Sequence, residues 1–464
     1  MEEMLNIVSK INSSMSDYVL LILLVGTGIY FTLSTRFVQI RCFFEGWRNA
    51  FGRSSEQDNK KTSLSPFQAL SAAIAAQVGT GNIVGASGAI LTGGPGSIFW
   101  MWVIAFFGMA TIYAEAVLAQ KTRIKDEDGT IHGGPVYYIK RAFPGTAGTL
   151  LAGFFAVAII VSLGFMGCMV QANSIGETCR NAFNVPTWIV GIIVAVFSAG
   201  VFLGGVSRLV KVTEKMVPLM AFVYLAGGVV ILICRIDYLP ATFAAIFKYA
   251  FCPEALIGGG FGYAIKVAVS QGAKRGLFSN EAGMGSTPHA HAIADVASPH
   301  VQGTVAMVGV FIDTAIVLTM TALIVISTIY TGDGPLAKAT GDTYAQLLAN
   351  SGLTQTNLVQ YAVSTVSNPK AGNIFVAVCL LFFAFSTILS WNYFGKINFS
   401  YLFGKKSVII YSALAVICIF LGTIMKSDLV WALQDMFNQL MVLPNVMALL
   451  SLTTLITSSA NNKA

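Results

Sequence analysis

The glycine-rich run from Ala75 to Gly85 lies in the middle of a long apolar stretch. Each glycine lowers helix propensity by about 1 kcal/mol, so the run predicts a break in a helix. A break frees backbone N–H groups, which attract a carboxylate, and backbone carbonyl groups, which bind a cation. Gln77, Thr80 and Asn82 add uncharged hydrogen-bonding side chains. The segment therefore suits a zwitterion together with a hard cation such as Na⁺.

A second glycine cluster lies further along the chain. It consists of Gly258, Gly259 and Gly260, and Phe261 and Gly262 follow it directly. Close packing between helices explains many single glycines in membranes, but it explains two dense clusters less well. We therefore expect the helix that contains this cluster to break between Gly258 and Phe261.

The segment from Phe385 to Trp391 carries hydroxyl groups within another apolar stretch. Ser386 and Thr387 are adjacent, and Trp391 follows Thr387 by four residues, so Thr387 and Trp391 share a helix face. This segment offers an ion ligand, a contact for a bound molecule and a bulky lid. The alternative is that each hydroxyl bonds back to its own helix, the commoner arrangement for a lone Ser or Thr.

Asp313 and Lys266 fall near the middle of apolar stretches, where charges are costly and are therefore candidates for function. Asp313 would either couple a cation or pair with another helix. Lys266 would snorkel to the membrane surface, pair with an acid or take part in proton coupling. His289 and His291 form a His-x-His pair without an evident third ligand, so we expect a gate or a hydrogen-bonded loop there instead of a metal site.

The composition indicates which elements must carry these residues. Of the 464 residues, 55% are apolar and only 11% are charged, whereas soluble domains carry about 25% charge. These figures exclude a disordered chain, a disulfide scaffold and an ordinary soluble enzyme, and they predict an all-α polytopic membrane protein. Runs of about 20 apolar residues, the length that crosses a bilayer, predict eleven transmembrane helices. The runs cover residues 16–35, 66–90, 97–120, 147–172, 188–206, 214–234, 255–279, 301–329, 372–394, 407–425 and 434–457.

The charged loops predict an orientation in the membrane. Most of the 28 Lys and Arg residues fall on one side when loop 36–65 is placed in the cytoplasm and the loops alternate from there. The positive-inside rule then puts the N-terminus outside and the C-terminus in the cytoplasm, and it explains the net charge of +7 without a nucleic-acid partner. The seven cysteines contain no Cys-x-x-Cys pair and predict no metal or redox site.

The two glycine clusters lie five predicted helices apart. Because five is odd, the two broken helices cross the membrane in opposite directions, and two five-helix units of inverted topology result. Paired broken helices of this kind mark the binding site of a transporter. The predicted organisation is an extra helix and basic loop over residues 1–62, a first unit over 63–236 and an inverted second unit over 237–464.

Other function classes fit these observations less well. Proton coupling through Asp313 or Lys266 stays open as an alternative to sodium coupling. A channel needs a continuous polar pore, whereas the polar groups cluster at one depth. A receptor would bring large soluble domains, and an enzyme would need a constellation of catalytic groups, which this sequence does not contain.

Five motifs carry a family resemblance: Ser65–Leu70, Val78–Ile83, Gly133–Pro135, Arg275–Gly285 and Phe385–Trp391. They resemble those of the alanine/glycine:cation symporter family of prokaryotes, within the amino acid–polyamine–organocation superfamily. The resemblance covers nearly the whole chain, and Arg275–Gly285 is its most specific part. It implies the leucine-transporter fold, with a core of ten helices in a 5+5 inverted repeat.

The resemblance also implies an activity. The expected function is sodium-coupled uptake of alanine or glycine by alternating access across a prokaryotic plasma membrane (a cell inner membrane where there are two). Na⁺ would be the co-transported ion, and no organic cofactor would take part. The partners would be the amino acid and the lipid bilayer, with no nucleic acid and no obligate protein partner.

Residue roles follow from the same resemblance. The residues expected to contact the substrate are Gln77, Gly79, Thr80, Gly81, Gly258, Gly259, Gly260, Phe261, Thr387 and Trp391. The expected Na⁺ ligands are Ala75, Val78, Ser386 and Thr387, with Asn82 at the position of a second ion. Asp313 and Lys266 are candidates for coupling or gating. The bulk of Phe261, Trp391 and Met166 favours a substrate of the size of alanine.

Overall fold

The computed structural model describes residues 2–14, 21–52, 64–126, 131–252, 261–338 and 342–461. These residues are almost entirely helical, with one short hairpin formed by β1 (Ile124–Lys125) and β2 (Ile131–His132). The helices up to the middle of the chain are α1 (Glu2–Ser14), α2 (Leu21–Ser34), α3 (Val38–Arg41), α4 (Phe43–Phe51), α5 (Pro66–Gln77), α6 (Ala86–Gly93), α7 (Ser97–Thr122), α8 (Pro135–Ala142), α9 (Thr146–Ile159), α10 (Cys168–Phe183), α11 (Thr187–Phe202), α12 (Gly205–Cys234) and α13 (Leu239–Phe251).

The second part of the chain is helical as well. Its α-helices are α15 (Phe261–Asn280), α16 (Pro288–His291), α17 (Pro299–Val310), α18 (Thr319–Val325), α19 (Asp342–Ser351), α20 (Leu358–Val366), α21 (Pro369–Phe403), α22 (Val408–Ile424), α23 (Ser427–Ser451) and α24 (Thr453–Asn461). Wider π-helical turns join several of these helices into longer rods. They are η2 (Gly81–Gly85), η3 (Ile160–Gly167), η5 (Phe311–Leu318) and η6 (Ile326–Tyr330).

Several of these rods are long and apolar enough to cross a bilayer. Within the described residues there are six such spans, and eight if each of two bent helix pairs counts as one. The six are Ser97–Thr122, Thr146–Phe183, Arg208–Cys234, Pro299–Tyr330, Pro369–Phe403 and Lys405–Ile424. The membrane character expected from the composition is therefore present, while the count of eleven spans stays a prediction.

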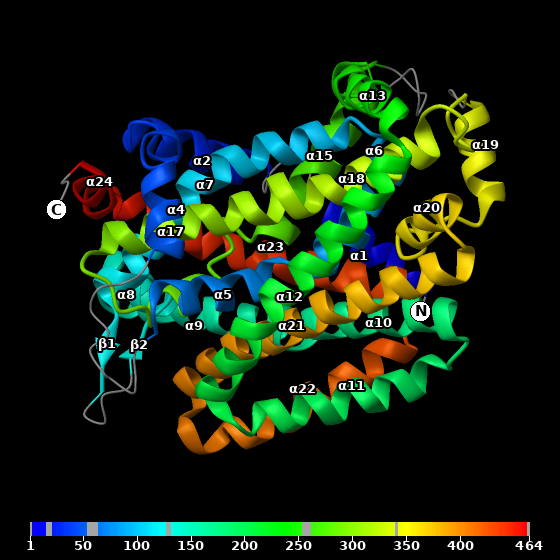
Figure 1. The fold of residues 1–464 in the computed structure, drawn as a ribbon. Helices are drawn as coiled ribbons and strands as arrows, with labels where there is room; N and C mark the ends of the chain where they lie inside the picture. Colours follow the sequence, from blue (N-terminus) through cyan, green and yellow to red (C-terminus); the bar gives the residue numbers. More distant parts are fainter. Residues whose placement is uncertain are drawn as a thin grey trace.

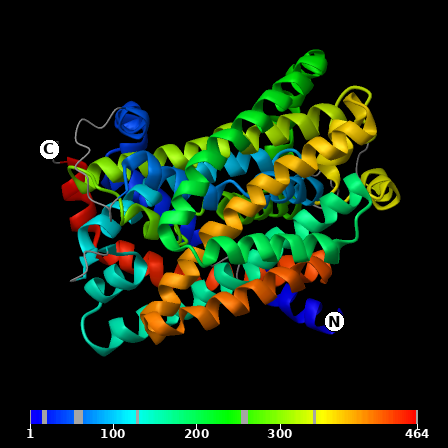
Figure 2. The same ribbon diagram turned by 60° about the horizontal axis from the view of Figure 1, so that its bottom comes forward.

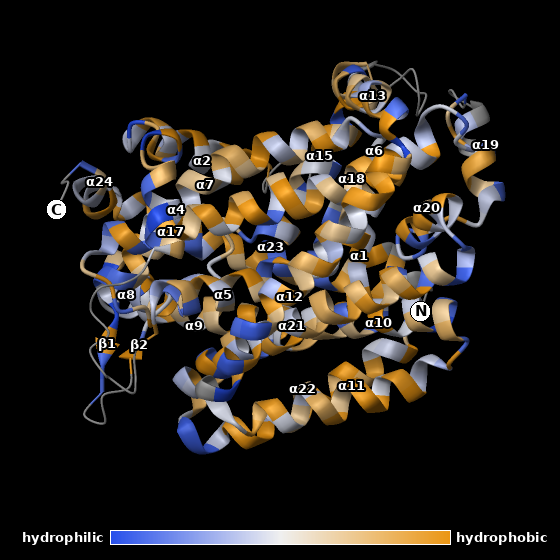
Figure 3. Ribbon diagram, in the orientation of Figure 1, coloured by the Kyte–Doolittle hydropathy of each residue, from blue (hydrophilic) through white to orange (hydrophobic). Residues whose placement is uncertain are grey.

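The long helices form one bundle around α21. This helix packs against α5, α10 and α12, while α7 packs against α15 and α17. Figures 1 and 2 show α11 and α22 as a pair along one edge of the bundle, and α1 and α24 at opposite ends of it. The ribbons of α11 and α22 are hydrophobic along most of their length (Figure 3), and Phe197 and Ile409 on these helices are 66% and 68% exposed. An exposed apolar face of this kind suits contact with lipid.

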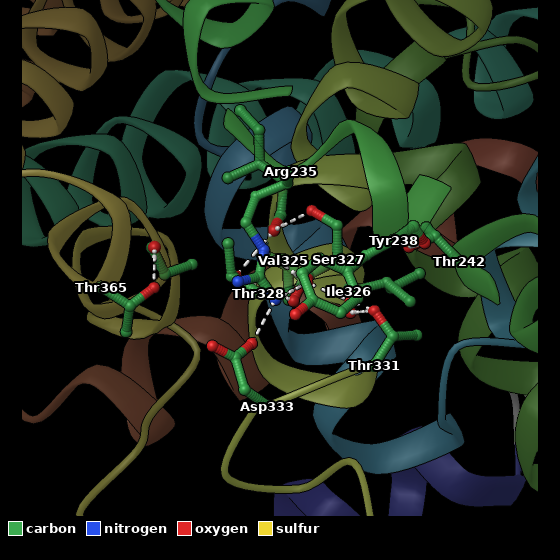
Figure 4. A network of polar contacts seen from close by, with 12 residues as sticks. Arg235, Tyr238, Thr242, Val325, Ile326, Ser327, Thr328, Thr331, Asp333 and Thr365 are labelled. Carbon is green, nitrogen blue, oxygen red and sulfur yellow. Dashed lines mark hydrogen bonds and ion pairs between the residues drawn. The ribbon is translucent and has the colours of Figure 1, made fainter. Parts of the chain in front are cut away.

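A polar network fastens two helix ends on the rim of the bundle (Figure 4). Arg235, just after α12, donates to the Ser327 carbonyl oxygen at 2.6 Å and forms an ion pair with Asp333 at 2.7 Å. Its guanidinium group also lies 4.0 Å from the ring centre of Tyr238. The hydrogen bond from the Arg235 side chain lowers the pKa of the exposed Asp333 carboxyl below its usual range. These contacts hold the end of α12 against η6.

The broken helix predicted at the first glycine cluster is present. Ser65 and Gln68 form a reciprocal capping box at the start of α5, and Pro66 occupies the first turn, where its missing N–H costs nothing. The helix ends at Gln77 and resumes at Gly81, and its two halves are bent by 48° relative to each other. The break therefore lies in the middle of the span. Side chains from neighbouring helices can bond there to the backbone groups that the break frees.

Candidate functional site

Two side chains replace the backbone partners that α5 would have had if it continued. The N–H of Gly79 donates to Asn82 Oδ1 at 3.0 Å, and the N–H of Thr80 donates to Gln171 Oε1 on α10 at 3.0 Å. In an unbroken helix these two N–H groups would bond to the carbonyl groups four residues earlier. The carbonyl group of Ala75 is consequently released for another partner.

Thr387 in the middle of α21 fills that role. Its hydroxyl group lies 3.0 Å from the Ala75 carbonyl oxygen and 3.4 Å from that of Val78, and it also bonds to Phe383 in its own helix. A side chain at Gly79 would collide with the Thr387 hydroxyl, so glycine permits this close approach. Two carbonyl oxygens and a hydroxyl are hard ligands suitable for Na⁺. The structure thus brings together three of the four expected sodium ligands at this site.

Ser386 does not join this group. Its hydroxyl donates to the Phe383 carbonyl oxygen at 2.8 Å and lies 3.6 Å from Met220 Sδ on α12. Successive residues on an α-helix point in directions about 100° apart, and in this structure Thr387 faces α5 while Ser386 faces α12. The Ser386 contact matches the alternative that a membrane Ser bonds back to its own helix, and its role as a sodium ligand stays a prediction.

Asp313, in η5, is the centre of a second polar cluster. Its fully buried carboxylate accepts hydrogen bonds from Asn82 at 2.6 Å, from Ser279 at 2.9 and 3.0 Å, and from Thr314 at 2.8 Å. Gly81 permits this arrangement, because a Cβ there would lie 3.0 Å from the Ser279 Cα. The cluster joins the first break to the end of α15 around a carboxylate, which can hold a cation or a proton.

The break expected between Gly258 and Phe261 stays a prediction, because its glycines lie outside the described residues, but a second break is present further along the chain. Residues 258–260 are outside the described residues, and Phe261 begins α15, which continues without interruption to Asn280. At 1.5 Å per residue, Phe261 is about 28 Å from Asn280, so it is not part of the site beside the first break. The chain leaves the helix at Glu281, whose φ is 59°, and α16 begins at Pro288.

A buried carboxylate explains why the helix can end there. Glu115 on α7 accepts hydrogen bonds from the N–H groups of Gly283 at 3.2 Å and Gly285 at 2.9 Å. Asn445 on α23 donates to Glu115 at 2.6 Å and to the Gly283 carbonyl oxygen at 2.9 Å. Non-helical backbone at membrane depth needs such partners. The partners come from distant helices, which is why the local glycine count does not reveal this break.

Polar atoms without hydrogen-bond partners belong to side chains at or beside the two breaks. Gln77 links them, because its Nε2 donates to the Asn280 carbonyl oxygen at 2.9 Å. Four buried side-chain atoms of this region have no hydrogen-bond partner among the described residues: Gln77 Oε1, Thr80 Oγ1, Gln171 Nε2 and Asn280 Nδ2. Buried polar atoms are rarely left unsatisfied, so a polar ligand is a direct explanation for the group. The sequence pointed to Gln77 and Thr80 but not to Gln171 or Asn280.

Trp391 lies on the other side of the second break. Its indole N–H donates to Glu281 at 2.5 Å, and its ring meets Phe278 edge-on with 5.6 Å between centroids. Phe278 in turn packs against Trp431 with 4.9 Å between centroids. The rings therefore form a column that runs from α21 through α15 to α23.

Charged residues continue that column toward one end of the bundle. Arg275 lies 4.7 Å above the Trp431 ring, and both Arg275 and Lys274 form ion pairs with Asp435, at 3.2 and 2.6 Å. Beyond them lies a cavity of about 610 Å³ between α1, α15 and α23, which Lys266 also lines. Lys266 thus belongs to this vestibule and not to the cluster around Asp313.

The side chains of His289 and His291 are both buried and hydrogen-bonded. Burial lowers the pKa of His289 to about 4 and that of His291 to about 3. His289 bonds to the Ser286 carbonyl oxygen and to Asn398, while His291 bonds to Gln302. Both rings are therefore neutral parts of a hydrogen-bonded segment after the second break, the arrangement expected in place of a metal site.

Comparisons with known proteins agree with this architecture. The model of the sodium:alanine symporter family matches residues 1–462. The sodium/alanine symporter AgcS of Methanococcus maripaludis is 40% identical over 98% of this chain and 96% of its own length. The putative sodium/proton-dependent alanine carrier protein YrbD of Bacillus subtilis is 37% identical over 97% and 90%, and the probable sodium/glutamine symporter GlnT of the same organism is 36% identical over 97% and 89%.

A solved structure shows the fold. The transporter MhsT, crystallised with L-phenylalanine, aligns with a TM-score of 0.62 over 88% of this chain and 94% of its own, at 14% sequence identity. This likeness is to a transporter of the leucine-transporter fold. The protein is a multi-pass membrane transporter for amino acids that is coupled to a cation, and it is not an enzyme. By its matched length and its relatives, the chain belongs to the sodium:alanine symporter family.

Proposed function

We propose that the protein carries a small neutral amino acid, alanine or glycine, into the cell together with Na⁺ by alternating access. The observation that supports this most is that buried polar atoms of Gln77, Thr80, Gln171 and Asn280, at or beside the two breaks, have no hydrogen-bond partner among the described residues. All four side chains are uncharged. An uncharged site disfavours acidic and basic amino acids, because a charged side chain would be buried there without a counter-ion.

The atoms can satisfy both ends of a zwitterion. The amide nitrogens of Gln171 and Asn280 and the hydroxyl of Thr80 are donors for a carboxylate, and Gln77 Oε1 is an acceptor for an ammonium group. The aromatic rings of Trp391 and Phe278 limit the space beside them. Gly167 on the far side of Trp391 has no room even for a Cβ. This packing supports a side chain no larger than a methyl group.

Two clusters are candidates for the coupled cation. The first consists of the carbonyl oxygens of Ala75 and Val78 and the hydroxyl of Thr387. The second is the Asp313 carboxylate with Ser279 and Asn82; the amide of Asn82 would have to turn its oxygen toward the ion, since it now presents its nitrogen. A buried carboxylate also suits a proton, and this favours proton coupling as the second candidate function.

One sodium ion would be sufficient for useful accumulation. Moving one positive charge down a potential of 100 mV yields about 2.3 kcal/mol, and a tenfold concentration gradient adds about 1.4 kcal/mol. The sum corresponds to a substrate gradient of roughly 500-fold. Transport would take place in the plasma membrane of a prokaryote, with the N-terminus outside and the C-terminus in the cytoplasm. The proposed inverted five-helix units are residues 63–236 and 237–464.

The test is uptake of labelled alanine into proteoliposomes that contain the purified protein. An inward Na⁺ gradient, a matched K⁺ gradient and an inward proton gradient are imposed separately. Uptake with Na⁺ alone is the expected result, and unlabelled alanine or glycine should compete with the label whereas lysine should not. Uptake with protons alone would replace sodium coupling by proton coupling. No uptake with any gradient, in protein shown to be folded, would contradict the proposed substrate.

A further inference from the structure

A group of metal-ligating side chains lies away from the substrate and cation clusters. Cys42 and Glu45, at the junction of α3 and α4, meet His300 in the first turn of α17. One donor atom of each side chain lies within 4.8 Å of the other two, and His300 Nε2 is 3.4 Å from Glu45 Oε1. Cys42 is 6% exposed and His300 8%, whereas the Glu45 side chain is 37% exposed. The group is therefore mostly buried with one side open to an ion.

Contacts of other residues already bring the two segments together. Gly46 packs so closely on α17 that a Cβ would collide with the Thr304 carbonyl oxygen. One turn further on, Asn49 donates to the Thr304 hydroxyl at 3.2 Å. Cys42, Gly46 and Asn49 are spaced by four and three residues and so share the helix face that meets α17. The ligands are thus pre-positioned, which lowers the entropic cost of binding.

The histidine ring is also oriented by a partner behind it. The Tyr113 hydroxyl, on α7, lies 2.7 Å from His300 Nδ1. This contact fixes the ring plane and leaves Nε2 directed at Glu45. Metal-binding histidines regularly have such a partner on the nitrogen that does not bind the metal, and its loss weakens metal affinity about 10–100-fold.

The donor set indicates the class of metal. A thiolate, an imidazole and a carboxylate suit Zn²⁺, whereas Na⁺, Mg²⁺ and Ca²⁺ select oxygen ligands. Two ligands that are each about 2.1 Å from a tetrahedral zinc ion stand about 3.4 Å apart, and this is the distance between His300 Nε2 and Glu45 Oε1. We propose that Cys42, Glu45 and His300 form a Zn²⁺ site with three protein ligands that fastens α4 to α17. Its fourth position is open to water.

The proposed zinc site is separate from the two candidate sodium clusters, and it joins parts of the chain that are far apart in sequence. Cys42 and His300 are brought together only by the packing of α4 on α17, which explains why a search for Cys-x-x-Cys spacing misses them. Cys42 is a thiol and not half of a disulfide. Its deprotonation on binding would release one proton per zinc ion.

The test is direct binding of metal to the purified full-length protein. Cys234 and Cys252 are the exposed cysteines, so the background carries Cys234→Ser and Cys252→Ser to remove competing thiols. Equilibrium dialysis should give one Zn²⁺ per chain. Cys42→Ser and His300→Gln should each weaken binding at least 100-fold, Tyr113→Phe should weaken it about 10–100-fold, and Cys179→Ser should have no effect.

A second measurement, the absorption spectrum of bound Co²⁺, needs no substitution in the proposed site. Co²⁺ added to the protein with Cys42 intact should give the visible bands of a tetrahedral ion and a thiolate-to-cobalt charge-transfer band, and Zn²⁺ should displace both. Mg²⁺ should displace neither. A stoichiometry well below one, or a charge-transfer band unchanged in a folded Cys42→Ser protein, would overturn the proposal.

Discussion

The hydroxyl group of Thr387 lies 3.0 Å from the carbonyl oxygen of Ala75, so that α21 touches α5 where its hydrogen bonds end. If this contact forms a sodium site, Thr387→Ala should raise the Na⁺ concentration for half-maximal uptake about 5–150-fold, since removing a partner of a buried polar group costs about 1–3 kcal/mol. Thr387→Ser should restore most of the affinity. Ser386→Ala is the matched control, because that hydroxyl faces α12. A larger effect of Ser386→Ala would contradict this assignment.

Asp313 tests the second cation cluster. Asp313→Asn keeps the shape of the side chain but removes the charge that Asn82, Ser279 and Thr314 now stabilise. We expect Na⁺-driven uptake to fall at least 10-fold, consistent with about 1.5–3 kcal/mol for hydrogen bonds to a charged group. Uptake is measured across a Na⁺ titration at two pH values. Asp333→Asn is the control, since Asp333 is exposed on the rim. An unchanged Na⁺ titration would exclude Asp313 from coupling.

Gln171 provides a test of the proposed substrate site. Its Oε1 accepts the N–H of Thr80, and its Nε2 has no hydrogen-bond partner among the described residues. Gln171→Leu should weaken alanine binding about 5–150-fold, because both the fixed loop and one donor are lost. Gln171→Glu retains the acceptor but opposes a carboxylate, and it should weaken binding at least as much. Calorimetric titration with alanine measures both. Equal affinity in all three proteins would remove Gln171 from the site.

The first break could be predicted from the sequence because its causes are local. Glycines, Gln77 and Asn82 all fall within one short segment, and the composition alone indicates a helical membrane protein. The direction in which a helix rotates is not local. Thr387 rather than Ser386 faces α5 because of how α21 packs on α5, α10 and α12 together. Sequence spacing could therefore name the hydroxyl pair but not select between its members.

The second break depended on residues far away in the chain. Glu115 and Asn445 bind the backbone of Gly283, and they lie 168 and 162 positions from it. Gln171 is likewise 91 positions from Thr80. A glycine cluster indicates where a helix is weak, but a helix ends inside a membrane only where other helices replace its lost hydrogen bonds. That information appears only when the helices are packed.

Asp435 tests whether the ion pairs at the end of the aromatic column hold α15 against α23. It pairs with both Lys274 and Arg275 and is 5% exposed. Removing one partner of a buried ion pair leaves the other charge unpaired and costs about 3–5 kcal/mol. Asp435→Asn should therefore lower the Tm of the purified protein, and Asp428→Asn, in the wall of the same cavity, should change it little. Equal Tm values for the two variants would show that the pair does not hold α15 against α23.

His289 makes the stability of the protein dependent on pH. Burial lowers its pKa from 6.5 to about 4, so the folded state keeps the ring neutral where the unfolded state takes up a proton. The contribution of His289 to the free energy of unfolding is then complete above pH 6.5. It falls by up to about 1.4 kcal/mol per pH unit as the pH drops toward 4, and it changes no further below that. The contacts agree with a neutral ring, because Nδ1 lies 2.7 Å from the Ser286 carbonyl oxygen and Nε2 lies 2.9 Å from the Asn398 amide nitrogen.

His289→Gln isolates this contribution. Glutamine can donate to Ser286 and does not titrate, so the variant should lose stability less steeply between pH 6.5 and 4. His291, whose pKa burial lowers to about 3, contributes in the same direction, and His289→Gln should therefore reduce the slope without abolishing it. Denaturant unfolding in detergent across this range measures the slope, with pH 7–8 as the internal control. An unchanged slope would mean that His289 is already protonated in the folded protein, and Nε2–H would then oppose the Asn398 amide group.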